Sequence, residues 1–173
     1  MQKYIKKIAF YIMAIGLVFT LSCINGGETE ERTFDDELAE LDSMLQKLID
    51  SGYDIDTTNI GVYYIIKEEG EGPFPKPGET CVIDLQGFFP NGNKFIDSKD
   101  YYTNGRWKFL YGQRQWHMTP GLESGIGQMN EGAKIEMIIP SNLAFGEKGT
   151  KTIPPYTTLI YKSKMHELNP VDD

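Results

Sequence analysis

Hydrophobic residues follow two different periods along the chain, one before residue 60 and one after it. Between Thr33 and Gly52 the period is helical, with steps of four and three that place on one face Phe34, Leu38, Leu41, Leu45 and Leu48. Thr33 is the expected N-cap, and Gly52 follows the expected end. The run covers little more than two heptads, so docking onto the protein's own domain is favoured over a coiled-coil dimer, which stays the alternative.

After Gly61 the period changes to two, which is typical of half-buried β-strands. The segments with this pattern are GVYYIIKEEGEG, TCVIDLQGFF, KFIDS, RWKFLYG, AKIEMIIP and LIYKSKMHEL. Asn91-Gly92 predicts a hairpin between the second and third of them. In PGLESGIGQM the residues Leu122, Ile126 and Met129 return to helical spacing. The sequence therefore predicts an α+β fold: a twisted antiparallel sheet of about five to six strands, wrapped over one short helix.

The last strand is preceded by a glycine-rich loop that ends in Pro154 and Pro155. Proline cannot donate to a sheet ladder, so this pair predicts a boundary with the strand starting after it.

The N-terminus has the pattern of an exported protein. Three lysines precede the uncharged stretch from Ile8 to Leu21, which is shorter than the about 20 residues of a membrane span but suits a signal peptide. The following FTLSC resembles the lipobox of bacterial lipoproteins. We therefore expect a signal peptide over residues 1–22, a lipid on Cys23, and a flexible acidic tether over residues 23–32. An ordinary signal peptide or a membrane anchor with an incidental cysteine is the alternative.

The charge of the chain excludes one class of partner. The formal net charge is −8, and removal of the leader would take away three more lysines. Nucleic-acid binding needs basic patches, so we expect no nucleic-acid partner, and a membrane attachment that depends on the lipid. With Cys23 lipidated, Cys81 has no disulfide partner and is interpreted as a small buried apolar residue.

The common catalytic constellations are missing from the sequence. Neither His117 nor His166 has a cysteine or a second histidine near it at the spacing of metal ligands. His166 falls on the charged face of the last strand, where we expect a surface residue. No nucleophile, phosphate-binding or dinucleotide-binding motif is present. We therefore expect neither a metal nor a cofactor. Instead the chain is rich in aromatic residues, 12% of the total, and a concave aromatic pocket is the default binding-site hypothesis for such a surplus.

Several motifs, taken in order, resemble the FKBP-type peptidyl-prolyl cis-trans isomerases. They are GEGPFPKPGETCVIDLQGFFPNGNKFIDS, WKFLYG, PGLESGIGQMNEGAKIEMIIPSNLAFG and IPPYTTLIY. The resemblance implies an FKBP-like domain over residues 61–169, preceded by the helix and a linker at 33–60 and followed by a tail at 170–173. It also implies a prolyl pocket between helix and sheet, bordered by the glycine-rich loop as a flap.

Position by position, the resemblance implies a set of site residues. The expected catalytic residues are Phe95, Asp97, Trp107, Phe109, Leu122, Phe145, Ile153 and Tyr161. The expected substrate-binding residues are Leu85, Met118 and Thr119.

The sequence departs from the family at three of the expected site positions. Leu85 and Phe145 stand where tyrosines are usual, and the usual aspartate is Ile96, with Asp97 one position later. A one-residue shift along a strand turns a side chain to the other face unless a bulge absorbs it.

Two functions follow from the resemblance. The first is a prolyl isomerase in the envelope of a Gram-negative bacterium, lipid-anchored and expected as a monomer in preference to a dimer, which acts on proline-containing segments of exported proteins. The alternative is a catalytically weak or inactive peptide-binding chaperone or assembly factor, similar to the gliding-motility-associated FKBP-like lipoproteins. An aromatic pocket fits isomerisation, because a twisted amide is favoured by desolvation and no proton transfer is needed.

Overall fold

The computed structural model describes residues 32–113, 115 and 118–169. All of them belong to one compact unit, Arg32–Asp173. The predicted signal peptide, Cys23, His117 and the predicted tail lie outside the described residues.

Helix α2 spans Phe34–Asp50 and begins as predicted at Thr33. The Thr33 hydroxyl accepts a hydrogen bond from the Asp36 amide at 3.3 Å, and the Asp36 carboxylate accepts one from the Thr33 amide at 2.8 Å, so these two amides satisfy each other's side chains in a capping box. The predicted apolar face is only partly buried. Leu41 is buried, but Phe34 and Leu38 are 44% and 45% exposed.

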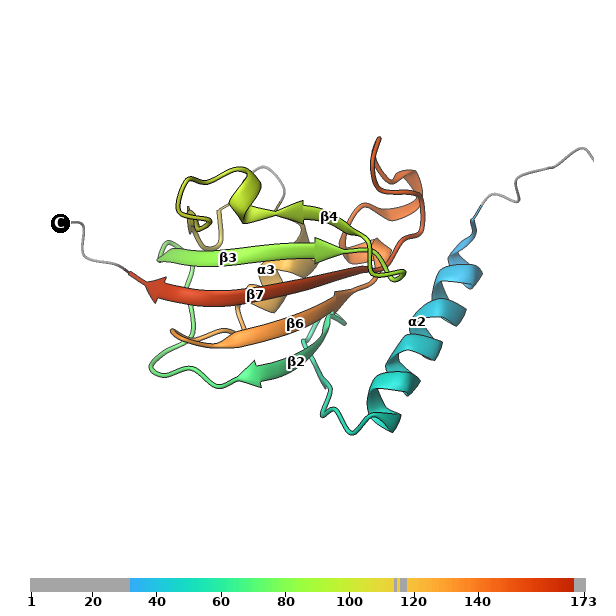
Figure 1. The fold of residues 1–173 in the computed structure, drawn as a ribbon, viewed down its shortest axis with the longest axis horizontal. Coiled ribbons are helices and arrows are strands. Elements are labelled where there is room, and N and C mark those ends of the chain that lie inside the picture. Colours follow the sequence, from blue (N-terminus) through green and yellow to red (C-terminus); the bar gives the residue numbers. More distant parts are fainter. Residues whose placement is uncertain (1–31, 114, 116–117, 170–173) are drawn as a thin grey trace, which may run out of the picture. The chain divides into compact units, whose positions relative to one another are not determined.

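The strands form one antiparallel, seven-stranded sheet with the order β1-β2-β6-β7-β3-β4, and β5 pairs with β3. Figure 1 shows the neighbouring strands β2, β6, β7, β3 and β4 in this order. Their bounds are β1 Asp56–Thr57, β2 Tyr63–Glu68, β3 Thr80–Phe88, β4 Lys94–Asp97, β5 Trp107–Leu110, β6 Lys134–Ile139 and β7 Leu159–Leu168. Three single-turn 3-10 helices lie in the connections, η1 Ser98–Asp100, η2 Ser141–Leu143 and η3 Gly146–Lys148. The predicted α+β class is confirmed. The strand count exceeds the predicted number because β1 has two residues, which is too short to show a period.

Helix α3, Pro120–Ile126, packs against the sheet, and Figure 1 shows it behind β3 and β7. Its glycines allow the close approach. A Cβ at Gly121 would lie 2.3 Å from Ile139 Cγ2, and a Cβ at Gly125 would lie 2.3 Å from Met137 Sδ. Only residues without a side chain fit at these two positions against β6.

The two faces of the sheet differ in chemistry, as the alternating pattern predicts. Along β7 the buried residues are Leu159, Tyr161, Ser163 and Met165. The other face is charged, and Glu136 there lies 3.5 Å from the Lys67 ammonium and 3.9 Å from that of Lys162. His166 lies on the charged face as expected, but its side chain is only 18% exposed and its Nε2 lies 3.2 Å from Asp84 Oδ2. His166 is thus a partly exposed residue of the charged face with a carboxylate beside it.

Among the described residues, no helix combines the length and the apolar character needed to cross a membrane. Within that same part of the chain, no group of three or more histidine, cysteine, aspartate or glutamate side chains is arranged to hold a metal ion.

Candidate active site

The residues that the sequence assigns to the pocket come from all layers of the domain, and most of them meet in one hydrophobic cluster. Its buried members include Leu85, Trp107, Phe109, Leu122, Ile153 and Tyr161. Partly buried against them lie Phe95, Met118 and Phe145. The structure thus brings together the expected site residues except Thr119 and Asp97. Their roles in binding and catalysis stay predictions.

Strand β5 supplies two aromatic rings from alternate positions. Trp107 and Phe109 point to the buried face, opposite Ile83 and Cys81 of β3. Their ring centroids are 4.5 Å apart with an interplanar angle of 35°. Such a pair presents a large, rigid apolar surface with little side-chain entropy to lose on binding.

A glycine inside β3 lets two other rings meet. Gly87 faces Tyr161 of β7 in the ladder, and a Cβ there would lie 2.6 Å from Phe95 Cζ and 2.9 Å from Tyr161 Cε1. Because that space is free, Phe95 and Tyr161 make an edge-to-face contact with centroids 5.7 Å apart. The sequence analysis missed Gly87, although an isolated glycine in a strand pattern signals a close approach.

Thr119 has a structural task at the start of α3. Its hydroxyl accepts a hydrogen bond from the Leu122 amide at 3.2 Å and so caps the helix. Leu122, at the position often occupied by tryptophan in the family that the sequence resembles, is 1% exposed. The cap therefore fixes the helix turn that places Leu122 in the cluster.

The connection between β6 and β7, residues 140–158, is the flap loop, and it carries Phe145 and Ile153. Gly149 has φ +56, and a Cβ there would lie 2.2 Å from the Ile153 carbonyl oxygen, so the loop closes on itself at this glycine. The Thr150 amide donates to that carbonyl at 2.7 Å, and the Thr150 hydroxyl accepts from the Ile153 amide at 3.0 Å. These bonds hold Ile153 with 5% exposure. The strand begins at Leu159, after both prolines, as predicted.

Asp97 lies apart from the aromatic cluster. The ladder of β3 and β4 shifts register at Phe95, so that Ile96 pairs with Gly87 and Asp97 pairs with Gln86. The Asp97 carboxylate accepts from Gln86 at 2.8 Å and from Lys94 at 2.6 Å, and it lines a cavity of about 270 Å³ on the charged face of the sheet. Burial alone would raise the pKa of Asp97, but the hydrogen bonds from Lys94, Gln86 and a backbone amide lower it to about 2.

Among the expected catalytic residues in the cluster, Tyr161 carries a hydroxyl. Burial raises the pKa of this phenol well above its usual value, so the group stays neutral at physiological pH. Its hydroxyl makes no hydrogen bond to another described residue.

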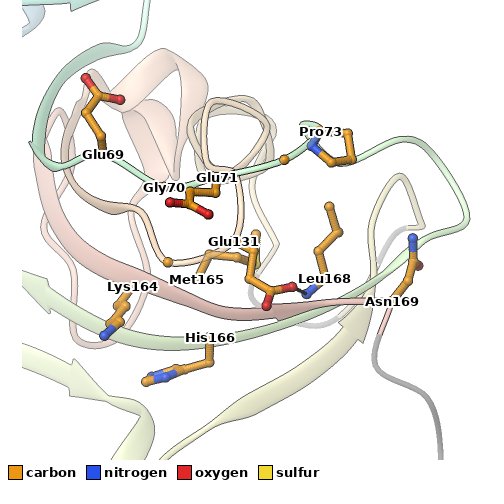
Figure 2. A pocket seen from close by; sticks show the side chains of 12 residues that line it. Glu69, Gly70, Glu71, Pro73, Glu131, Lys164, Met165, His166, Leu168 and Asn169 are labelled. Atoms are coloured by element: carbon orange, nitrogen blue, oxygen red, sulfur yellow. Dashed lines mark hydrogen bonds between the residues drawn. The ribbon is translucent and has the colours of Figure 1, made fainter.

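A cavity larger than the one beside Asp97 lies at the C-terminal end of β7, as Figure 2 shows. It measures about 720 Å³ and is bordered by the loop of residues 69–73, by Glu131 and by the last residues of the strand. The Glu131 carboxylate accepts a hydrogen bond from the Leu168 amide at 3.1 Å. No phenylalanine, tyrosine or tryptophan is among the described residues lining it, so this cavity does not have the character of a prolyl pocket.

Comparison with known proteins connects this cluster to a family. The family model described as FKBP-type peptidyl-prolyl cis-trans isomerase matches residues 72–166, more than half of the chain. The chain belongs to the FKBP-type peptidyl-prolyl cis-trans isomerase family. The matched segment contains every expected site residue from Leu85 to Tyr161, and the resemblance drawn from the sequence is confirmed.

Individual FKBP relatives agree with this assignment. The FKBP-type peptidyl-prolyl cis-trans isomerase FkpA of Escherichia coli is 31% identical over 116 residues, which is 67% of this chain and 41% of the relative. The chain therefore spans less than half the length of this curated FKBP protein.

Solved FKBP structures share the fold. The crystal structure of FkpA from Escherichia coli has a TM-score of 0.66 at 26% identity and covers 80% of this chain and 61% of its own. A peptidyl-prolyl cis-trans isomerase from Pseudomonas syringae has a TM-score of 0.66 at 22% identity, over 81% and 98% of the two chains. The predicted FKBP-like fold is confirmed by these neighbours.

Proposed function

We propose that this domain catalyses the cis-trans isomerisation of X-Pro bonds in polypeptides, through the cluster formed by Phe95, Trp107, Phe109, Leu122 and Tyr161 and the flap residues Phe145 and Ile153. The observation that carries the proposal is the convergence of these side chains within a segment that matches the isomerase family.

Isomerisation must overcome the resonance of the peptide bond. Rotation about an X-Pro bond faces a barrier close to the ~18–20 kcal/mol of peptide bonds and takes tens to hundreds of seconds without help. At the transition state the amide is twisted and its dipole is reduced. An apolar pocket that excludes water favours this state over the planar, solvated amide, and so lowers the barrier without any acid or base.

The residues of the cluster fit this chemistry. The Tyr161 phenol is neutral at physiological pH, and burial raises its pKa further, so it can donate a hydrogen bond to a substrate carbonyl but does not act as a base. Asp97 is the one carboxylate among the expected catalytic residues, and it already accepts hydrogen bonds from Gln86 and Lys94. Among the expected catalytic residues, the means of catalysis are therefore desolvation, shape and the Tyr161 hydroxyl.

The cellular setting belongs to the same proposal. A signal peptide over residues 1–22 and a lipid on Cys23 would hold the domain at a membrane of the Gram-negative cell envelope, and unfolded segments of exported proteins would be its substrates. The acidic composition supports a lipid anchor, since the net charge of −8 opposes binding to anionic lipids by charge.

A second function is favoured by the same three positions that depart from the family pattern. Leu85 and Phe145 bring no hydroxyl to the site, and Ile96 brings an apolar side chain where the family has a carboxylate. A pocket of this kind would still bind proline-containing segments, and the protein would act as a chaperone or assembly factor without turnover.

Exchange NMR on a short X-Pro peptide distinguishes the two functions. The protein would be residues 23–173 carrying Cys23→Ser, so that no lipid is attached. Catalysis predicts exchange between cis and trans resonances above the uncatalysed rate at tens of micromolar protein. Binding without catalysis predicts shifted peptide resonances at an unchanged rate, and an absence of both effects would refute the pocket itself.

A further inference from the structure

Glu37 is a fully buried acidic residue in the first turn of helix α2, outside the predicted apolar face. Its Oε1 accepts hydrogen bonds from the Ser141 amide and the Thr158 hydroxyl, each at 2.7 Å. Its Oε2 accepts from the Ser141 hydroxyl. A buried carboxylate is costly unless its oxygens are bonded, so these three donors are what make the position tolerable.

The three donors stand at the two ends of the flap loop. Ser141 is the second residue after β6, and Thr158 is the last residue before β7. Ser141 also begins η2, where Pro140 is the N-cap residue and provides no side-chain hydrogen bond. Glu37 therefore caps this helical turn from a distant part of the chain, and its negative charge suits the N-terminal end of the turn.

A second contact reaches the flap loop near its C-terminal end, two residues before Thr158. The Arg32 guanidinium donates to the Tyr156 carbonyl at 2.7 Å. The Tyr156 amide in turn donates to the Gly146 carbonyl at 3.0 Å, next to Phe145. Tyr156 has φ +47, an uncommon conformation for a residue with a side chain, which persists only where neighbouring contacts impose it. The Phe34 ring, 6.4 Å from that of Tyr156, adds to these contacts.

We propose that α2 positions the flap of the active site, with Glu37 as the positioning residue that joins the two ends of the loop. By fixing Ser141 and Thr158 to one carboxylate, Glu37 sets the placement of Phe145 and Ile153 between them. The catalytic consequence rests on the proposed isomerase function. The ordering of the loop does not, so the two can be tested apart.

The test compares variants of one helix in the chain without its leader, residues 23–173 with Cys23→Ser. Glu37→Gln keeps the shape of the side chain but sets an amide group against the donors. Glu37→Ala removes all three bonds. Asp42→Asn, on an exposed position of the same helix, is the matched control, and Leu41→Ala loosens the helix packing while leaving the carboxylate in place.

Two measurements are made on each folded variant: hydrogen exchange of the amides in residues 141–158, and kcat and KM for an X-Pro peptide by exchange NMR. Glu37→Gln and Glu37→Ala should speed flap exchange at least tenfold and lower kcat/KM about tenfold, chiefly by raising KM. Asp42→Asn should change neither. Leu41→Ala should affect the flap less than either Glu37 variant does.

Unchanged flap exchange and unchanged KM in both folded Glu37 variants would overturn the proposal and leave Glu37 a residue of fold stability only. If both variants fail to fold, Thr158→Val decides, because it removes one donor and leaves the carboxylate two. It should then speed flap exchange severalfold, and the absence of any change would equally refute the proposal. An inactive wild-type protein would refute the isomerase function, while faster flap exchange in Glu37→Gln would still support the positioning role.

Discussion

Asp97 pairs with Gln86 across β3 and β4, and its carboxylate accepts a hydrogen bond from the Gln86 amide group at 2.8 Å. We predict that Asp97→Asn changes kcat/KM less than threefold but destabilises the fold at neutral pH by about 1.5–3 kcal/mol, the value of hydrogen bonds to a charged group. The variant and wild type would be compared by urea unfolding and peptide exchange NMR. A tenfold loss of kcat/KM with intact stability would instead place Asp97 in the reaction.

The same comparison has a defined pH dependence. The folded-state pKa of Asp97, about 2, is below its ordinary value of 3.8, so the carboxylate stabilises the fold above about pH 4. That contribution is lost as the pH falls through the folded pKa. The difference in unfolding free energy between wild type and Asp97→Asn should therefore shrink between about pH 5 and pH 2, whereas a constant difference would contradict the assigned pKa.

Phe145 lies in the flap where the family has a tyrosine, and a hydroxyl there would bond a substrate carbonyl. We predict that Phe145→Tyr raises kcat/KM about three- to tenfold, the effect of one hydrogen bond worth ~0.5–1.5 kcal/mol. Exchange NMR with the same X-Pro peptide measures it, with Phe89→Tyr as a control on a partly buried ring nearby. An unchanged or lower rate would count against the missing hydroxyl as a limit on catalysis.

Tyr161 offers the hydroxyl that Phe145 lacks. Since this group bonds no other described residue, Tyr161→Phe should change the unfolding free energy by less than about 0.5 kcal/mol. If the hydroxyl donates to the substrate, kcat/KM should fall about three- to tenfold. Thermal unfolding and peptide exchange would be measured on one preparation, and an unchanged kcat/KM would remove Tyr161 as a hydrogen-bond donor.

Gly87 holds open the space in which Phe95 and Tyr161 meet. Gly87→Ala would bring a Cβ to 2.6 Å from Phe95 Cζ, so we predict a destabilisation of about 1–3 kcal/mol and a loss of activity as the rings separate. Combining it with Phe95→Leu, which shortens the obstructing side chain, should recover part of the stability and none of the activity. A fully active Gly87→Ala protein would show that the ring contact is dispensable.

Cys81 should be inert in the folded protein. It is completely buried, and burial together with nearby Glu79 raises the pKa of its thiol to about 12. In the Cys23→Ser chain we predict that iodoacetamide at pH 8 labels Cys81 at least a hundredfold more slowly than it does in the denatured chain. Mass spectrometry over a urea series would report labelling, and rapid labelling without denaturant would reveal local opening of β3.

The sequence predicted the strands and most of the aromatic cluster because both depend on local patterns. Alternation along β6 and β7 shows which residues face inward, and the family motifs carry Trp107, Phe109 and Leu122 with them. The sequence did not show to which face of the sheet Asp97 points. A bulge at Phe95 decides the face, and the bulge depends on how β3 and β4 pair.

Glu37 escaped the sequence analysis for a different reason. A glutamate in the first turn of a helix is ordinarily solvated and stabilises the helix N-terminus, so neither the residue type nor its position indicated that Glu37 is buried. Its burial depends on donors more than a hundred residues away, at Ser141 and Thr158. The burial of Phe34 and Leu38 was overestimated, because helical spacing shows which residues share a face but not which part of that face is buried.

The order of strands in the sheet has a consequence for how the chain folds during synthesis. Strand β7 is the last of the described strands to be synthesised, yet it lies between β6 and β3. Until its residues leave the ribosome, β1, β2 and β6 on one side and β3, β4 and β5 on the other have no ladder in common. The sheet therefore closes only after β7, Leu159–Leu168, has been translated, and long-range pairing of this kind is slow and exposes strand edges meanwhile. A protein proposed to help other chains fold is itself open to aggregation until its final strand is in place.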